Sequence, residues 1–235
     1  MNSIKLTEYN LLADVKKELK FAFLADLHNH PNEPILEALK MANPNALLVG
    51  GDFIHNFFVF ERGFEFLNQA SKILPTFCVL GNHERRYIGE LRKLVLKSGV
   101  TLLDNDFCEF GGINIGGLTS GAFYKGNHLR PNTDFLTQFS QLEGYKILIS
   151  HHPEYYPKYI KDLPVNLTLS GHAHGGQWRL FGRGAYAPGQ GVFPKYTKGI
   201  YDGRFIVTSG VGNVYLVPKI NNPPEICVIN LKAEK

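Results

Sequence analysis

The chain has 235 residues, of which 44% are hydrophobic and 20% charged, values typical of a globular protein. This length provides one substantial core, and we expect a single domain over residues 1–235. The formal net charge of +4 comes from 25 cationic residues spread along the chain, without a dense basic run. That pattern argues against specific nucleic-acid binding.

The three cysteines, Cys78, Cys108 and Cys227, lie far apart and form no CxxC pair. An odd number at such spacing favours free thiols in a reducing compartment over a disulfide framework or a zinc site. Residues 1–20 carry several charges and no long apolar segment, so we expect neither an export signal nor a membrane span. The predicted location is the cytoplasm.

The first predicted strand covers residues 19–25 and stops at Asp26-Leu27-His28. A carboxylate and an imidazole therefore follow directly after a buried segment. Taken alone, such a pair is more often a polar turn than a functional site. A helix is predicted from Asn32, with Pro34 in its first turn, because an Asn cap and an early proline are typical of helix starts.

Two further apolar runs repeat this pattern. Residues 46–49 form a predicted strand that leads to Asp52, and residues 76–80 form one that leads to Asn82 and His83. Apolar residues at helical spacing predict helices after these strands and later in the chain, at 64–74, 88–95 and 133–142. Alternation of strands and helices is typical of an α/β fold whose strand ends carry the ligands.

The second half of the chain is richer in predicted strands. They are expected at 107–110, 113–115, 145–149, 167–169, 205–208, 214–217 and 226–231. The strand at 145–149 leads to two adjacent histidines, His151 and His152. The strand at 167–169 leads to the sequence GHAHGGQ at 171–177, in which flanking glycines permit a sharp turn.

Five apolar runs thus end in carboxylate, imidazole or amide side chains. The set is Asp26/His28, Asp52, Asn82/His83, His151/His152 and His172/His174. Each group alone is more often structural, but five at strand ends in one chain predict a metal site. Ligands of these types without thiolate favour Mn, Fe or Zn. One ion cannot take so many ligands, so we expect two divalent ions, with Asp52 as the candidate bridge.

The order D-x-H, G-D, G-N-H-E, H and G-H-x-H between Asp26 and His174 resembles the calcineurin-like metallophosphoesterase superfamily. The sequence GHAHGGQWRL at 171–180 is similar to the final motif of a bacterial subgroup, GHxHGGQxRL. That subgroup contains many membrane- or envelope-associated phosphoesterases, including enzymes that cleave the pyrophosphate of UDP-diacylglucosamine. The resemblance implies an α/β fold of four layers, an α-β-β-α sandwich in which helices flank two mixed β-sheets.

The resemblance also implies a role for each motif residue. It implies a first ion held by Asp26, His28, Asp52 and His174. It implies a second ion held by Asp52, Asn82, His151 and His172. His83 is then the catalytic histidine, oriented by the carboxylate of Asp26, and His152 fills the variable position of a His-x-Pro motif. Glu84 is expected to support the turn that carries His83.

We therefore predict a dinuclear-metal-dependent phosphohydrolase in which a metal-bridging hydroxide attacks phosphorus in line. The expected substrate is a phosphodiester or a pyrophosphate, and the sequence leaves open whether it is nucleotide- or lipid-linked. A phosphomonoesterase, including a protein phosphatase, and a non-catalytic scaffold of the same fold are the alternatives. Arg85, Arg86 and Arg179 are candidate phosphate contacts, with a solvated surface role as the alternative.

The segment 178–201 is rich in aromatic residues. Three interpretations stay open for it: a flap over the site, a shallow membrane-contacting surface, or packing over the sheet edge. Members of the subgroup often begin with a membrane helix or export signal, and none is expected here, which weighs against a lipid-linked substrate. The sequence leaves the oligomeric state open.

Overall fold

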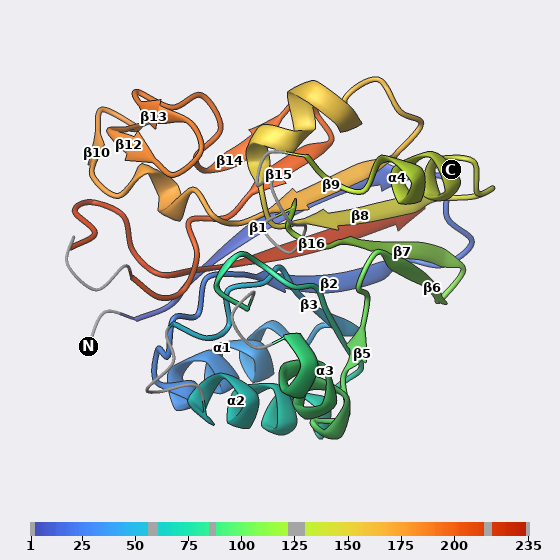
Figure 1. Ribbon diagram of the computed structural model, residues 1–235, viewed down its shortest axis with the longest axis horizontal. Coiled ribbons are helices and arrows are strands. Elements are labelled where there is room, and N and C mark those ends of the chain that lie inside the picture. Colours follow the sequence, from blue (N-terminus) through green and yellow to red (C-terminus); the bar gives the residue numbers. More distant parts are fainter. Residues whose placement is uncertain (1–2, 56–60, 85–87, 122–129, 214–217, 234–235) are drawn as a thin grey trace.

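The computed structural model describes residues 3–55, 61–84, 88–121, 130–213 and 218–233. Two six-stranded mixed sheets pack against each other, and helices cover their outer faces (Figure 1). The strand order is β1-β16-β2-β3-β4-β5 in the first sheet and β14-β15-β9-β8-β7-β6 in the second. This arrangement confirms the predicted α/β fold of two mixed sheets flanked by helices.

The strands of the first sheet come from both ends of the chain. They are β1 (Lys5–Ala13), β2 (Leu19–Leu24), β3 (Ala46–Val49), β4 (Thr76–Cys78), β5 (Thr101–Leu102) and β16 (Glu225–Ala233). Strands β2 to β5 run parallel to one another, and β16 lies antiparallel to β2. Consequently the polar residues that follow β2, β3 and β4 all lie at one edge of this sheet.

The second sheet has a similar parallel centre. Its strands are β6 (Asp106–Phe110), β7 (Ile113–Leu118), β8 (Lys146–Ser150), β9 (Leu167–Ser170), β14 (Gly199–Tyr201) and β15 (Phe205–Val207). Strands β7, β8, β9 and β15 are parallel, whereas β6 and β14 pair antiparallel at the two margins. The residues that follow β8 and β9 therefore share an edge as well.

The helices divide between the two outer faces. Against the first sheet lie α1 (Asn32–Ala42), α2 (Glu61–Ser71) and α3 (Ile88–Lys97). Against the second lie α4 (Thr133–Ser140), a 3-10 turn (Pro153–Tyr155) and a π-helical turn (Tyr156–Ile160). Helix α1 begins at Asn32 itself, after Pro31, so Asn32 is its first residue and not the predicted cap. Its buried amide instead donates to the carbonyl of Arg62 at 3.3 Å.

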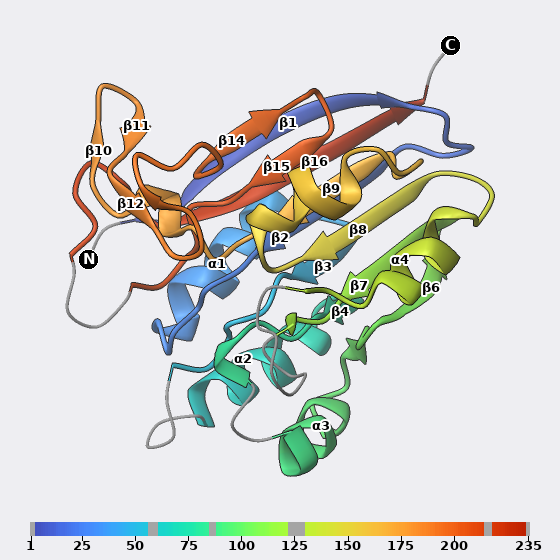
Figure 2. The same cartoon turned by 45° about the horizontal axis from the view of Figure 1, so that its top comes forward.

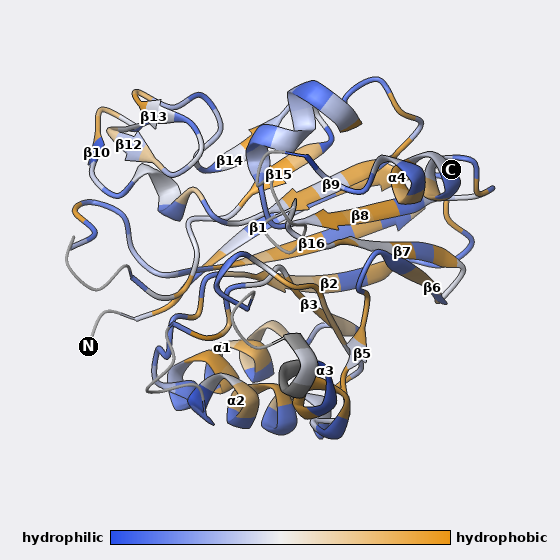
Figure 3. Cartoon of the chain, in the orientation of Figure 1, coloured by the Kyte–Doolittle hydropathy of each residue, from blue (hydrophilic) through white to orange (hydrophobic). Residues whose placement is uncertain are grey.

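Side chains that alternate along each strand build the three apolar layers. In β2, Phe21 and Phe23 point between the sheets, whereas Ala22 and Leu24 pack against the helices. In β8, Ile147 joins the layer between the sheets, and the next residue, Leu148, packs on the side of α4. Figure 3 shows these central strands and the inner faces of the helices as the most hydrophobic parts of the molecule. Because strand residues alternate in direction, continuous apolar runs are expected for strands covered on both faces.

Several elements differ from the sequence predictions. Strand β1 was not predicted, although it pairs with β16 in parallel over nine residues. Two small hairpins, which we call the lobe (178–201), stand beside the end of the second sheet (Figure 2). Its strands are β10 (Arg179–Leu180), β11 (Arg183–Gly184), β12 (Tyr186–Ala187) and β13 (Gly191–Val192). The strand predicted at 214–217 lies outside the described residues.

Within the described part of the chain, every helix is too short or too polar to cross a lipid bilayer.

Candidate metal centre

The loops after five parallel strands meet at one edge of the sandwich. Hydrogen bonds between loops of the two sheets hold them together: the amide of His172 donates to Asp26 Oδ2 at 3.0 Å, and His151 Nδ1 donates to the carbonyl of Gly50 at 2.7 Å. The amide of Gly171 also donates to the carbonyl of His151 at 3.1 Å, which ties the two histidine loops to each other. Loops far apart in sequence thus form one surface.

Most of the predicted ligands have left-handed backbone angles. The φ values are 55° for Asp26, 42° for His28, 53° for Asp52, 63° for His172 and 46° for His174. A non-glycine residue in this region is strained, and such strain concentrates at functional sites because the surrounding contacts enforce it. Here the strained residues carry the side chains whose ligand atoms gather at this edge.

Two glycines allow the loops to approach so closely. A Cβ added at Gly81 would lie 2.2 Å from Asp52 Oδ1, and one added at Gly171 would lie 2.9 Å from Asp26 Oδ2. Any larger residue would displace a carboxylate that the loops position. These glycines are therefore part of the site geometry and not only breaks between elements.

Four groups of His, Asp or Glu among the described residues could hold an ion, and the predicted ligands form two of them. The other two combine His28 with His55 and His83, and His172 with His152 and Glu154. Of the two predicted groups, one contains Asp26, His28 and His174, and its ligand atoms all lie within 4.8 Å of one another. The second contains Asp52, His151 and His172, and its ligand atoms also lie within 4.8 Å of one another. All six residues are buried. The structure thus brings together six of the seven side chains predicted as metal ligands, in two compact groups.

The carboxylate of Asp52 lies between the two groups. Its Oδ1 accepts from the amide of His83 at 2.9 Å, so that oxygen is held by the backbone. Its Oδ2 lies 3.9 Å from His28 Nε2 and 3.2 Å from His151 Nε2, one imidazole from each group. The seventh predicted ligand, Asn82, has a buried Oδ1 with no hydrogen-bond partner among the described residues.

The two adjacent histidines have different environments. His151 donates from Nδ1 to a backbone carbonyl, which leaves Nε2 facing Asp52. His152 instead is hydrogen-bonded at both nitrogens, through Nε2 to Ser120 Oγ at 2.7 Å and through Nδ1 to Glu154 Oε1 at 3.1 Å. Its ring centroid lies 4.4 Å from that of His172, so His152 supports a ligand rather than offering a lone pair of its own.

Glu84 supports the loop that carries His83, as the sequence predicted. Its buried carboxylate accepts from the amides of Gly81 at 2.7 Å, Asp52 at 2.9 Å and Ile54 at 3.3 Å. Burial, together with the neighbouring Asp52, raises the pKa of Glu84 to about 7. The residue fixes two strand ends relative to each other and lies beneath the site rather than in it.

His83 lies at the open side of the site, with about a third of its side chain exposed. Its Nδ1 donates to the backbone carbonyl of His55 at 2.6 Å, and its Nε2 lies 3.8 Å from Asp52 Oδ2. The orienting contact therefore comes from His55, where the sequence analysis expected the carboxylate of Asp26. A donor at Nδ1 leaves Nε2 as the nitrogen that can exchange a proton with a substrate.

The electrostatics of the site suit bound cations. Asp26 and Asp52 are at most 1% exposed, and neither forms an ion pair with Lys or Arg in the described ranges. Burial lowers the pKa of His28, His172 and His174, which keeps these imidazoles neutral, as metal ligands must be. Burial also lowers the pKa of His151, but the carboxylates of Asp52 and Asp26 outweigh it and raise that pKa to about 10.

The polar atoms that face the site also fit a metal centre. Among the described residues, His28 Nε2 and Asn82 Oδ1 are buried and have no hydrogen-bond partner. Buried polar atoms are normally paired, because an unpaired one costs about 1–3 kcal/mol. Nitrogen and oxygen donors without sulfur match Mn, Fe or Zn, so the residues present fit the ions that the sequence predicted.

The predicted arginine contacts have mixed outcomes. Arg85 and Arg86 lie outside the described residues. The guanidinium of Arg179 donates to the carbonyls of Gly175 and Gly182 and to Thr197 Oγ1, so most of its hydrogen-bonding capacity is used within the chain. A direct phosphate contact from Arg179 stays a prediction, and its observed bonds brace the turn after His174.

Three residues of the site were missed by the sequence analysis. His55 follows Asp52 by three positions and stacks on His83 with ring centroids 5.8 Å apart. Ser120 and Glu154 hold His152 between them. A signal existed for Ser120, since it follows the end of β7 as the other site residues follow their strands. His55 and Glu154 had no comparable pattern.

The family of the chain follows from comparison with known proteins. The model of the calcineurin-like phosphoesterase family matches residues 19–176, which include β2 to β9 and all seven predicted ligands. The chain belongs to this family.

Individual relatives are bacterial. The chain is 30% identical over 238 residues to the phosphodiesterase YaeI of Escherichia coli, covering 90% of this chain and 82% of that protein. It is 28% identical over 247 residues to the metallophosphoesterase Cj0846 of Campylobacter jejuni, covering 95% of this chain and 62% of that protein. A metallophosphoesterase of Bacillus subtilis, YkuE, is 27% identical over 85% of this chain and 72% of its own length. The chain thus spans less than two thirds of the Campylobacter relative.

Proposed function

We propose that the chain is a dinuclear-metal phosphohydrolase that cleaves a phosphodiester or a pyrophosphate. The observation that carries this proposal is the position of Asp52 Oδ2, which faces an imidazole from each of the two buried ligand groups. A carboxylate shared between two sets of ligands is the usual bridge of a two-metal phosphoryl site. The proposed bridge is Asp52.

The proposed ligands follow the two groups. Asp26, His28, Asp52 and His174 would hold one ion. Asp52, Asn82, His151 and His172 would hold the other. Manganese, iron or zinc fits these donors, and the nitrogens that face the site belong to imidazoles kept neutral by burial or fixed by a backbone carbonyl.

The chain's own residues orient the groups that would act on the substrate. Two divalent ions, when bound by these ligands, would supply a water of lowered pKa and positive charge for the phosphate. His83 projects from the open side of the site, and the carbonyl of His55 fixes its Nδ1 as a donor, so its Nε2 holds or gives a proton at the leaving oxygen. Glu84 keeps the His83 loop and Asp52 in register through three amide hydrogen bonds.

A diester or pyrophosphate substrate is favoured over a monoester because one relative, YaeI, is named a phosphodiesterase and shares 30% identity with the chain. A phosphomonoesterase is the alternative, and a lipid-linked or nucleotide-linked leaving group fits either reaction. A non-catalytic scaffold is disfavoured because the predicted ligands and His83 are all present.

The proposal includes one domain and a cytoplasmic location. Residues 5–13 pair with residues 225–233 in the first sheet, which supports a single folding unit over residues 1–235. The three cysteines are free, and two of them are buried, which supports a reducing compartment. The subgroup with the GHxHGGQxRL motif is the proposed place of the chain within its family.

The test is hydrolysis of bis-p-nitrophenyl phosphate against p-nitrophenyl phosphate. The purified protein is stripped of metal and reloaded separately with Mn, Fe, Zn or Mg, and metal content is measured alongside turnover. Metal-dependent cleavage that favours the diester is the expected result. Preference for the monoester supports the alternative reaction, and no turnover with two ions bound contradicts the proposal for these ester classes.

A further inference from the structure

The lobe exposes an unusual amount of apolar surface. Of the twelve large apolar side chains that are exposed among the described residues, eight lie in the lobe or beside it. They are Trp178, Leu180, Phe181, Tyr186, Val192, Phe193, Ile200 and Ile220. Monomeric soluble proteins rarely gather exposed apolar residues in this way, and such gatherings mark interaction surfaces. The apolar positions at the turn beyond β10 and around β13 also appear in Figure 3.

Two phenylalanines of the lobe point into solvent at an energetic cost. Phe181 is fully exposed and has a φ of 49°, and Phe193 is 83% exposed and has a φ of 52°. Phe181 and Gly182, which both have positive φ, form the turn between β10 and β11, where Asn, Asp or Gly is the favoured first residue. A bulky residue in the left-handed region is an outlier. An aromatic ring held there without packing indicates a role outside the fold.

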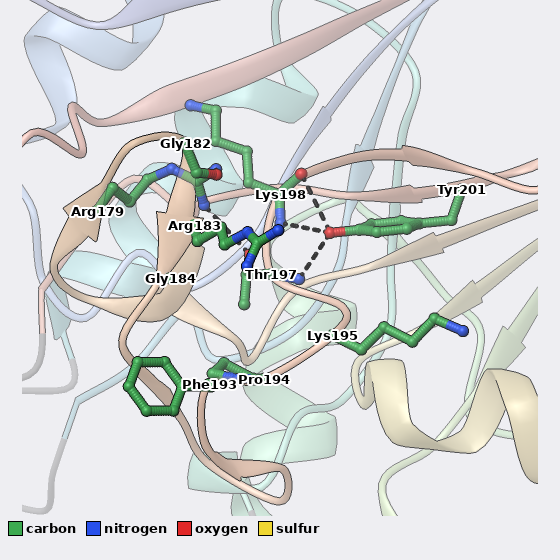
Figure 4. Close-up of a pocket in the computed structure, with 10 residues that line it drawn as sticks. All are labelled: Arg179, Gly182, Arg183, Gly184, Phe193, Pro194, Lys195, Thr197, Lys198 and Tyr201. Atoms are coloured by element: carbon green, nitrogen blue, oxygen red, sulfur yellow. Dashed lines mark hydrogen bonds between the residues drawn. The ribbon is translucent and has the colours of Figure 1, made fainter.

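A cationic cavity lies beside these rings. It has a volume of about 350 Å³ and is lined by Arg179, Arg183, Lys195 and Lys198 together with Phe193, as Figure 4 shows. None of the described residues that line it is acidic. The sequence 178–201 contains these four cations and no Asp or Glu.

The four cations are not equivalent. Lys198 forms an ion pair with Glu225 at 2.9 Å, and Arg179 is bonded to backbone carbonyls. Arg183 and Lys195 are both exposed, and in the described ranges neither forms an ion pair. Their charges are therefore available to an external anion, next to the exposed rings.

The lobe also has a fixed position relative to the metal centre. It begins four residues after His174, and Arg179 ties its first strand to the carbonyl of Gly175. The amide of Ala185 donates to the carbonyls of Gly176 and Trp178, so the second hairpin is attached to the same turn. A surface bound by the lobe would lie beside the edge where the ligands gather (Figure 2).

We propose that the lobe is a docking surface for an anionic lipid bilayer. Phe181, Phe193 and their apolar neighbours enter the interface, while Arg183 and Lys195 meet lipid phosphates at the headgroup level. An anionic bilayer would bind both the exposed rings and the cations. The rings bury in its interface, and cations without an ion-pair partner are attracted by anionic lipids. A second copy of the chain would bring the same unpaired cations together. This inference is independent of the proposed activity, because binding requires no turnover.

Binding is measured by co-sedimentation of the full chain with vesicles of phosphatidylcholine and with vesicles that also contain phosphatidylglycerol. The single tryptophan, Trp178, is about half exposed within the surface and reports contact by a blue shift of its emission. Binding to the anionic vesicles only, with that blue shift, is the expected result. Absence of binding to anionic vesicles would overturn the proposal.

Matched variants separate the two parts of the surface. Phe181→Ser with Phe193→Ser should weaken vesicle partitioning at least about tenfold, whereas Leu12→Ser with Met41→Ser, at positions 72% and 73% exposed elsewhere, should leave it unchanged. Arg183→Glu with Lys195→Glu should also weaken vesicle partitioning at least about tenfold. The control, Lys40→Glu with Lys72→Glu, changes the net charge equally and should weaken partitioning much less.

Two controls complete the design. Thermal unfolding and hydrolysis of a soluble p-nitrophenyl ester check that each variant is folded, so lost binding is not mistaken for lost structure. If inorganic phosphate competes fully for the cationic cavity and the phenylalanine variants bind vesicles like the original chain, the site is for a free anion and the bilayer proposal is wrong.

Discussion

The edge of the sandwich that carries the candidate metal ligands and the lobe at 178–201 depart in opposite ways from the usual pattern, in which charged residues are exposed and apolar residues are buried. At the edge, two carboxylates and five histidines are buried, and in the described ranges neither carboxylate forms a direct ion pair with Lys or Arg. In the lobe, aromatic rings are exposed at strained backbone angles. Buried charge and exposed apolar surface are both costly in an isolated chain, so each indicates a partner. The partner is a cation in the first region and an apolar, anionic surface in the second.

The largest expected effect comes from Asp52→Asn, which tests whether one carboxylate serves both ligand groups. The amide keeps the shape but removes the charge that faces both groups, so both ions should bind weakly and turnover should fall by more than the roughly 100-fold typical of a supporting residue. Metal analysis and steady-state kinetics measure the two losses together. Turnover equal to that of the original chain would remove the bridging assignment.

His83→Ala separates chemistry from metal binding at the same edge. Loss of a general acid lowers kcat by roughly 10²–10⁴-fold, and the two ions should stay bound because His83 is placed at the open side. Metal content per chain is the deciding measurement. A parallel loss of metal would show that His83 is a ligand.

A smaller effect is expected for His152→Ala, because its ring packs against His172 while Ser120 and Glu154 occupy both of its nitrogens. Activity should fall roughly 10–100-fold. The neighbouring change His151→Ala is the matched comparison and should cost far more in both metal and turnover. The reverse order would mean that the wrong histidine of this pair was assigned as ligand.

The smallest effect on activity is expected at Glu225, which joins the lobe to the first sheet through Lys198. Burial raises the pKa of Glu225, but Lys198 and hydrogen bonds from Thr7 and Ser209 outweigh it, so the pKa lies below the ordinary 4.5. Because the unfolded chain then takes up the proton first, this stabilisation is complete above about pH 4.5 and is lost as the pH falls through the folded-state pKa.

Glu225→Gln should therefore lower the free energy of unfolding by about 2 kcal/mol at neutral pH, the contribution of hydrogen bonds to a charged group, and flatten its fall in acid. Denaturant unfolding at several pH values measures both changes. Glu109→Gln, at an exposed position of β6, is the control and should change neither. If the two variants behave alike, the Lys198 pair contributes nothing to the attachment of the lobe.

The sequence predicted the part of the fold in which local signals agree. Strand β3 was placed at residues 46–49, as observed. The candidate ligands could be proposed because buried parallel strands are continuous apolar runs that end abruptly. Strand β4 ends at Cys78, two residues earlier than predicted, although Val79 still donates to the carbonyl of Val49.

Other features depend on contacts that no local pattern encodes. Strand β1 mixes polar and apolar residues and is half-exposed, and its partner β16 lies more than 200 residues away, so the pairing was not predicted. The strands of the two hairpins in the lobe, β10 to β13, have two residues each, too few to show alternation. His55 and Glu154 entered the site through the packing of loops, and only the folded chain shows that His152 is held from both sides.

The most direct test of the central claim is metal analysis of the reloaded chain, combined with anomalous scattering from its crystals. Two Mn, Fe or Zn ions per chain on either side of Asp52 is the result that we expect. A single ion, or ions bound away from the Asp26 and Asp52 carboxylates, would contradict the dinuclear site.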